Sequence, residues 1–194
     1  MNLPKFSRDL ITGIALVALL AVTRIGHFGG IATPPDASLA VFFLLGLWVA
    51  SPRWLVIGLL AAAAADALAI AQGASSYCIT PAYPFLIPTY GVIWGAGRAT
   101  CVYAARWHGW QRGLALAVAL LASTTTAFVL SNASFYALSG YFEAMPVGDF
   151  VRGVSPYYRP YLTGAAAYVA VAIVCRRLLL GPERESAGSV PAKP

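Results

Sequence analysis

The stretch WLVIGLLAAAAADALAIAQ, residues 54–72, contains only one charged residue, Asp66. A helix needs about 20 mostly apolar residues to cross a hydrocarbon core that is roughly 30 Å thick. The whole chain of 194 residues is 59% hydrophobic and only 10% charged, whereas an average soluble domain is about 25% charged. This stretch and the composition together predict a helical membrane protein.

Five further hydrophobic stretches accompany the one at residues 54–72. They lie at residues 9–25, 37–50, 86–106, 114–139 and 161–180. We therefore predict an all-α membrane protein, a bundle of six transmembrane helices within residues 1–180. Residues 181–194 are polar and rich in Pro and Gly, which is typical of a disordered tail. Lys5 and Arg8 precede the first stretch as in a secretory signal, but the chain stays hydrophobic far beyond it, so we expect the first helix to be retained.

Basic residues occupy every second gap between the hydrophobic stretches. They are Lys5 and Arg8, Arg53, Arg106 and Arg112, and Arg176, Arg177 and Arg184. Lys and Arg mark cytoplasmic loops, so both chain ends are predicted to be cytoplasmic. The loops at residues 24–36, 73–85 and 140–160 then face outside. The net charge of +6 is spread over these inner positions and forms no basic stripe of the kind that binds nucleic acid.

Three arginines, Arg24, Arg152 and Arg159, lie on the predicted outer side, against the positive-inside bias. Such a residue needs a local reason, either an anionic ligand or a buried carboxylate. The loop at 140–160 places aromatic residues around Arg152. It is interpreted either as an aromatic belt at the membrane surface or as a lid over a ligand that is partly apolar and partly anionic.

The stretch GASSYCITPAYPFLIP, residues 73–88, places Cys78 in an outer loop among small polar residues, prolines and tyrosines. Cys101 and Cys175 fall toward the inner ends of their helices, so Cys78 has no disulfide partner within the chain. A free cysteine is often a small space-filling residue. Because an exposed thiol is prone to oxidation outside the cell, three functions are also considered: soft-metal ligand, nucleophile and intermolecular disulfide.

Asp66 lies in the outer half of its predicted helix, where a carboxylate costs on the order of 3 kcal/mol on insertion scales. It is expected to belong to a site or to form a hydrogen bond between helices. His27, in RIGHFGG at residues 24–30, is either an interfacial hydrogen-bonding residue or a group that assists proton transfer near Cys78. The sequence has no Walker-A, HExxH or paired CxxC pattern, which disfavours ATP hydrolysis by that route and zinc or dithiol chemistry.

Several of these segments together resemble a known family of transporters. They are RIGHFGGIATPPDASLAVFFLLG at residues 24–46, Asp66, YCITPAYP at residues 77–84 and LSNASFYALSGYF at residues 130–142. In these features the chain is similar to the BtuM-like family, the solitary substrate-binding components (S-components) of energy-coupling-factor-type transporters for cobalamin. The lone outer cysteine after the third hydrophobic stretch is the most specific element of the resemblance.

The resemblance implies uptake of cobalamin across a bacterial inner membrane from a pocket that is open to the periplasm. It implies a thiolate ligand to the cobalt of the corrin, a role that falls on Cys78. The polar residues around the pocket would be His27, Asp66, Tyr83 and Arg152. The family also implies decyanation, in which binding displaces the axial cyanide of cyanocobalamin. A thiolate is a suitable soft ligand for a transition metal that the corrin ring already holds.

The resemblance further implies a partner, an energy-coupling module with ATPase subunits. S-components usually dock through an Ala-x-x-x-Ala ridge on the first helix, whereas this chain has Gly13, Val17 and Ala21 at that spacing. Solitary members either work without a dedicated module or borrow one. Two other functions remain open: an intramembrane enzyme with Cys78 as nucleophile and His27 as base, and a structural subunit of a membrane complex.

Overall fold

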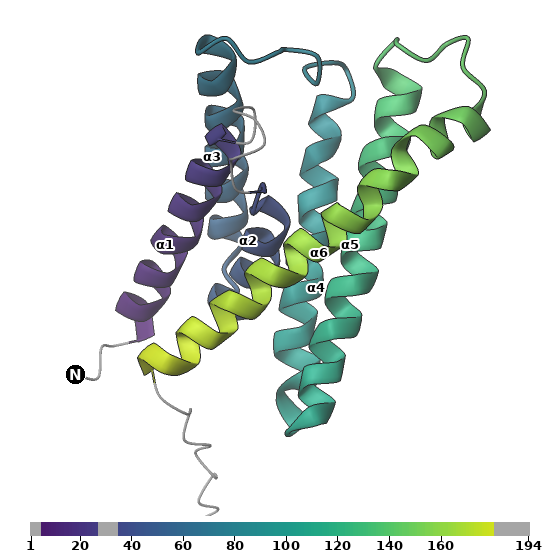
Figure 1. Ribbon diagram of the computed structural model, residues 1–194. Coiled ribbons are helices and arrows are strands. Elements are labelled where there is room, and N and C mark those ends of the chain that lie inside the picture. Colours follow the sequence, from purple (N-terminus) through teal and green to yellow (C-terminus); the bar gives the residue numbers. More distant parts are fainter. Residues whose placement is uncertain (1–4, 27–34, 181–194) are drawn as a thin grey trace, which may run out of the picture.

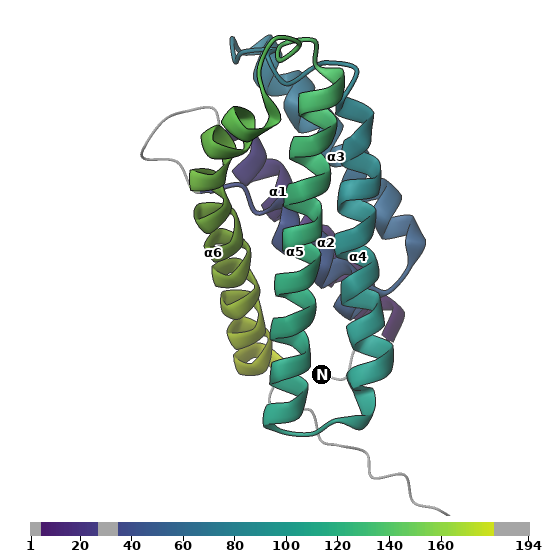
Figure 2. The ribbon, with the colours of Figure 1, turned by 90° about the vertical axis from the view of Figure 1, so that its right-hand side faces the viewer.

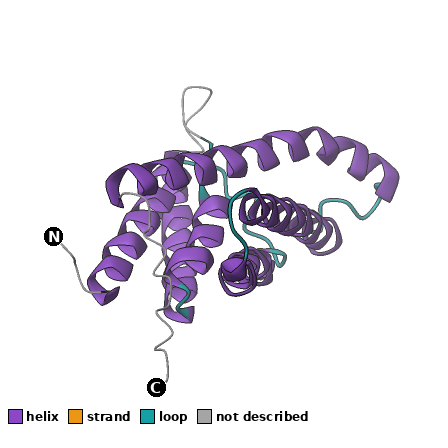
Figure 3. Ribbon diagram, turned by 90° about the horizontal axis from the view of Figure 1, so that it is seen from below, coloured by secondary structure: helices purple, strands orange, loops and turns teal. Residues whose placement is uncertain are grey.

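The computed structural model describes residues 5–26 and 35–180. All regular structure in these ranges is helical (Figure 3), which confirms the predicted all-α fold. The main helices are α1 Lys5–Gly26, α2 Ser38–Leu44, α3 Pro52–Ala71, α4 Leu86–Tyr103, α5 Trp110–Leu138 and α6 Val147–Leu180. A π-helix, η2 Leu45–Val49, continues α2, and two 3-10 helices flank α4: η3 Tyr83–Phe85 and η4 Ala104–Arg106. The predicted tail at 181–194 lies outside the described residues.

Successive helices run in opposite directions along the bundle (Figures 1 and 2). The start of α1 and the end of α6 therefore lie at the same end, which we call the terminal end. The connections at residues 72–85 and 139–146 lie at the opposite end, which we call the loop end. Arg53 lies in the first turn of α3, Arg106 follows α4 and Arg112 lies in the first turn of α5. The basic residues that predict a cytoplasmic side thus lie toward the terminal end.

Among the described residues, four helices are long and apolar enough to cross a membrane. These candidate spans are Phe6–Ile25, Pro52–Ala71, Trp110–Leu138 and Val147–Leu179. They are compatible with a protein that passes the membrane several times. The second predicted stretch forms a shorter apolar helix, Ser38–Val49. At about 1.5 Å per residue this helix is about 18 Å long, which is less than the roughly 30 Å of the hydrocarbon core. The count of six spans stays a prediction.

The short α2 helix is buried in the centre of the bundle along its whole length. Phe42 and Phe43 have no exposed surface. The backbones of this segment and of α4 meet at two glycines. A Cβ atom on Gly46 would overlap the carbonyl oxygen of Trp94, and a Cβ atom on Gly97 would overlap that of Phe43. Only glycine permits this close crossing, so α2 packs backbone to backbone on α4.

Gly97→Ala is expected to lower the free energy of unfolding by roughly 1–3 kcal/mol, because the added methyl group must displace the Phe43 backbone. Gly95→Ala is the matched control. It lies in the same helix with no atom within 4 Å of an added Cβ, so it is expected to be neutral or stabilising, by up to about 1 kcal/mol. Thermal unfolding of the purified protein in detergent measures both. Equal losses in the two variants would contradict the close crossing.

Helix α6 begins at Val147, so residues 147–160 are helical. Our prediction of an outer loop over 140–160 was therefore wrong for most of that segment. Pro156 and Pro160 favour a loop in the sequence, because proline lacks the N–H group that a helix needs. The carbonyl group left without a partner by Pro156 is that of Arg152. The Ser155 hydroxyl donates to this oxygen at 3.2 Å, which allows the helix to continue through the proline.

Candidate functional site

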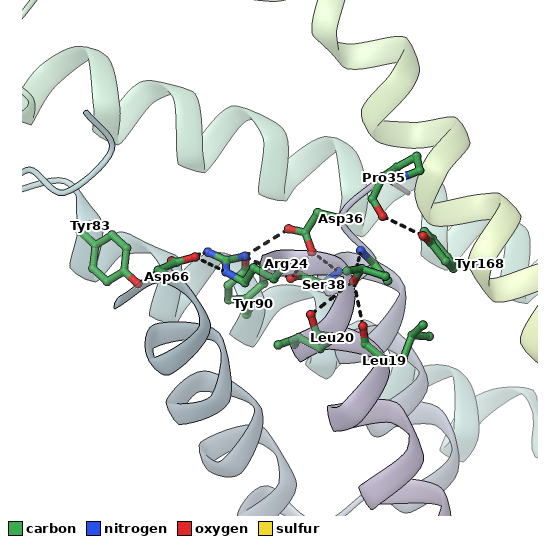
Figure 4. Close-up of polar contacts among 12 residues, drawn as sticks. Leu19, Leu20, Arg24, Pro35, Asp36, Ser38, Asp66, Tyr83, Tyr90 and Tyr168 are labelled. Atoms are coloured by element: carbon green, nitrogen blue, oxygen red, sulfur yellow. Dashed lines mark hydrogen bonds and ion pairs between the residues drawn. The ribbon is translucent and has the colours of Figure 1, made fainter. Parts of the chain in front are cut away.

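A buried ion pair joins α1 to α3 toward the loop end (Figure 4). Arg24 lies in the last turn of α1 and Asp66 in the second half of α3. The Arg24 Nε donates to Asp66 Oδ1 at 2.7 Å, and its Nη2 donates to Oδ2 at 2.8 Å. The two side chains are only 11% and 8% exposed. This bidentate geometry is the strong form of the pair. Of the two explanations given for an arginine at position 24, the structure shows the buried carboxylate.

The remaining guanidinium nitrogen of Arg24 reaches α4 and the start of α2. Its Nη1 donates to the Tyr90 hydroxyl oxygen at 2.7 Å and to Ser38 Oγ at 3.1 Å. It also lies 3.2 Å from Asp36 Oδ2. Asp36 Oδ1 accepts hydrogen bonds from the backbone N–H and the hydroxyl of Ser38, at 2.9 and 2.6 Å. One arginine therefore ties α1 to α3, to α4 and to the segment that leads into α2.

Tyr83 joins this group from the connection that precedes α4. Its hydroxyl donates to Asp66 Oδ2 at 2.7 Å, so the Asp66 carboxylate accepts three hydrogen bonds. Burial raises the pKa of Tyr83 most, and the hydrogen bond to Asp66 raises it further. The phenol therefore stays protonated and acts as a donor at neutral pH. We call the following residues the Arg24 cluster: Arg24, Asp36, Ser38, Asp66, Tyr83 and Tyr90.

Cys78 lies in the same connection as Tyr83 and is an exposed, free cysteine. Partial burial of its sulfur raises the pKa of the thiol most, the Asp66 carboxylate raises it further, and Arg24 lowers it. The thiol is therefore protonated at neutral pH. Two charged groups of the Arg24 cluster are close enough to act on it. A soft metal that binds the sulfur must displace the thiol proton.

The connection that carries Cys78 is held at two points. Before the cysteine, Tyr77 stacks on Tyr141, with ring centroids 4.5 Å apart and ring planes 5° apart. Tyr77 also meets Phe135 of α5 edge to face at 5.6 Å. After the cysteine, Tyr83 is hydrogen-bonded to Asp66. The thiol is thus positioned between an aromatic group at the end of α5 and the Arg24 cluster.

The structure brings together three of the five predicted site residues, namely Asp66, Cys78 and Tyr83. Arg152 lies elsewhere, on α6, with a side chain that is 84% exposed and with Nη1 3.3 Å from Asp149 Oδ1. His27 lies outside the described residues. In the two described ranges, no three His, Cys, Asp or Glu side chains form a group that could hold a metal ion. A metal bound at Cys78 would therefore have to bring most of its own ligands.

Four members of the Arg24 cluster are absent from the predicted site: Arg24, Asp36, Ser38 and Tyr90. The sequence contains a feature that could have identified two of them. Arg24 opposes the positive-inside bias, and Asp36 is one of only seven acidic residues in the chain. No feature of the sequence sets Ser38 and Tyr90 apart, because a serine near a helix start and a tyrosine near a membrane surface are both common. Only the fold shows that they belong to one cluster.

Two cavities lie at opposite ends of the bundle. A cavity of about 240 Å³ at the loop end is lined by Tyr136, Ala137, Gly140, Phe142 and Glu143. A larger cavity of about 670 Å³ lies between α4 and α5 toward the terminal end. Neither is lined by Cys78 or by a member of the Arg24 cluster. A ligand at Cys78 would therefore bind outside both cavities.

The fold and its apolar helices place the protein in the class of all-helical proteins that are compatible with a multi-pass position in a membrane. Within that class, the protein has a buried cluster of charged residues next to an exposed cysteine thiol. No protein-family model matches the chain, and no curated protein is similar to it.

Proposed function

We propose that this protein binds cobalamin at the loop end and takes part in its uptake across a bacterial inner membrane, as a solitary S-component. The observation that carries the proposal is the position of Cys78, an exposed free thiol in a connection that Tyr83 fastens to Asp66. The cobalt of a corrin already has its equatorial ligands from the ring. One soft protein ligand on the axial face is then enough to hold it.

The raised pKa of Cys78 favours a metal ligand over a nucleophile. A catalytic cysteine generally has a lowered pKa, because the thiolate is the attacking form. Here burial and Asp66 keep the thiol protonated. A metal can still bind, because coordination itself removes the proton. Among the described residues, the combined effect of burial, Asp66 and Arg24 therefore does not activate the thiol as the alternative of an intramembrane thiol enzyme requires.

Binding of cyanocobalamin at Cys78 would be a ligand exchange. The sulfur–cobalt bond forms and the cobalt–carbon bond to cyanide breaks. Cyanide leaves with the electron pair of that bond and takes up the thiol proton, so that hydrogen cyanide is released. The exchange needs neither an oxidant nor a reductant. The product holds the corrin by a metal–sulfur bond, which supports retention of the vitamin after capture.

The Cys78 connection must open to admit such a ligand. Neither of the two cavities described above is lined by Cys78, so a ligand at the thiol needs space that the connection now occupies. Two contacts restrain the connection, namely the Tyr77–Tyr141 stack and the Tyr83–Asp66 hydrogen bond. We infer that the connection acts as a lid, and that Asp66 and Tyr83 contact the ligand when this hydrogen bond is exchanged.

An energy-coupling module would dock on a different face of α1 from the one that carries Gly13, Val17 and Ala21. A Cβ atom on Gly13 would overlap the ring of Trp54 in α3. Val17 also packs against the core. The Gly13 face of α1 is therefore covered by the chain itself. Ile11, Ile14 and Val22 are more than half exposed, and they form the face that remains for an ATPase-coupled partner.

Labelling of Cys78 tests the side of the membrane and the ligand together. In a Cys101→Ser, Cys175→Ser background, a membrane-impermeant maleimide added to intact spheroplasts is expected to label Cys78. Cobalamin at about ten times its Kd is expected to slow the labelling about tenfold, by simple mass action. The rate of maleimide incorporation with and without cobalamin is the measurement.

Gly113→Cys, in a chain without the three native cysteines, is the control for sidedness. Gly113 lies in the first turn of α5, and a Cβ there meets no atom within 4 Å. It is expected to react only after lysis. If position 113 were labelled in intact spheroplasts and Cys78 were not, the protein would have the opposite orientation in the membrane. Labelling of Cys78 without protection would reject the corrin site and favour the enzyme or the structural subunit.

A further inference from the structure

The cavity of about 670 Å³ between α4 and α5 lies far from Cys78, toward the terminal end. Alanines form much of its wall: Ala99, Ala104, Ala115, Ala119 and Ala122. Small side chains that face each other leave the space between the two helices unfilled. The α4–α5 hairpin also extends beyond the other helices at this end (Figures 1 and 2), so no other described helix fills the space.

Aromatic residues surround the part of this cavity nearest the α4–α5 connection. Tyr103, Trp107 and Trp110 line it, and they are 74%, 47% and 75% exposed. Tyrosine and tryptophan are enriched where a membrane protein meets the headgroup region of the bilayer. In a membrane, this preference would place the aromatic rim at the headgroup level and the alanine wall in the hydrocarbon layer.

Two exposed arginines adjoin this aromatic rim. Arg106 directly precedes Trp107, and Arg112 directly follows Gln111, and both Trp107 and Gln111 line the cavity. Neither arginine lines the cavity, but each is one residue away from a side chain that does. An apolar, alanine-walled space with two neighbouring cations is complementary to a molecule with a hydrocarbon chain and an anionic head. Basic pockets between transmembrane helices are known to bind anionic lipid headgroups.

We propose that the α4–α5 cavity binds one acyl chain of an anionic phospholipid, with the phosphate held by Arg106 and Arg112. The volume of about 670 Å³ lies within the range of roughly 300–1,000 Å³ that encloses a single ligand of moderate size. A partner helix would also fill an apolar groove, but it would gain nothing from two arginines at the rim. The charge therefore selects the lipid. This site is independent of the proposed cobalamin site.

Retention of lipid by the purified full-length protein tests the site. The protein in detergent is offered equal amounts of phosphatidylglycerol and phosphatidylcholine, and bound lipid is counted by native mass spectrometry. The parent is expected to prefer phosphatidylglycerol. Arg106→Gln with Arg112→Gln is expected to reduce that preference about 25-fold, since each basic residue near an anionic headgroup contributes roughly fivefold in binding. Ala119→Leu, which narrows the cavity, is expected to weaken the retention of both lipids.

Two controls match these variants. Arg8→Gln with Arg53→Gln removes the same charge from exposed positions at the same end of the bundle. Ala117→Leu adds the same side chain to an exposed face of α5 outside the cavity. Both are expected to keep the parent's lipid retention within about twofold. Equal loss in the control arginine pair would reduce the effect to general charge attraction and overturn the site. If the parent is a dimer and Ala119→Leu is a monomer, the site would also be overturned, because the cavity would then be an interface between two copies.

Discussion

Arg24→Gln is expected to lower the free energy of unfolding by about 3–5 kcal/mol, the usual result of removing one partner from a buried ion pair. Asp66 has only 8% of its side chain exposed and, among the described residues, would keep a single hydrogen bond, from Tyr83. Asp36 would lose its cation as well. The variant therefore removes from these two carboxylates the cation that pairs with both of them in the described part of the chain. Thermal unfolding in detergent and the amount of protein in the membrane measure the loss.

The surface variant Arg159→Gln is the control for Arg24→Gln, because the residue is exposed on α6 and such changes generally stay within about 0.5 kcal/mol. Adding Asp66→Asn to Arg24→Gln removes the unpaired charge and is expected to recover part of the lost stability. If Arg24→Gln unfolds at the same temperature as Arg159→Gln, the cluster does not hold α1, α3 and α4 together. The interpretation of Asp66 as a residue that supports the site would then also be rejected.

Cys78→Ser is expected to abolish cobalt–sulfur ligation while leaving the fold stable to within about 0.5 kcal/mol, since the residue is exposed. The parent protein with cyanocobalamin is expected to show a shifted visible spectrum and to release cyanide. The serine variant is expected to show neither, because a neutral hydroxyl is a poor ligand for a soft site. Absorption spectra and a cyanide assay are the two measurements. An unchanged spectrum in the variant would reject Cys78 as the cobalt ligand.

The pH dependence of binding gives this prediction a second readout. With a corrinoid whose upper ligand is water, no cyanide is present to take the thiol proton, so binding at Cys78 releases one proton to solution. The pKa of the thiol lies above its ordinary value, so the thiol is protonated throughout the range below it. Affinity is therefore expected to rise about tenfold per pH unit between about pH 5.5 and 7.5. In Cys78→Ser the affinity is expected not to change with pH over this range. If the affinities of both proteins rose equally with pH, the released proton would come from another group.

Local properties of the sequence determined the helical class of this protein and the places where chemistry concentrates. Long apolar runs have few other stable solutions in a membrane, because every backbone group must find a partner within its own helix. A carboxylate within such a run is so costly that the sequence alone predicts a partner for Asp66. Cys78 could be placed in a connection because GASSYC ends an apolar run and prolines follow it.

Only the tertiary structure decided which residues meet. Arg24 and Asp66 are 42 positions apart, and their pairing depends on the packing of α1 against α3, which no local pattern encodes. The burial of α2 depends on the crossing of Gly46 and Gly97 over opposing backbones, a long-range fit between two elements. The early start of α6 depends on the Ser155 hydroxyl, which replaces the hydrogen bond that Pro156 removes. Apolar patterns and proline positions are properties of one segment, whereas these contacts depend on the relative positions of atoms that only the folded chain brings within reach.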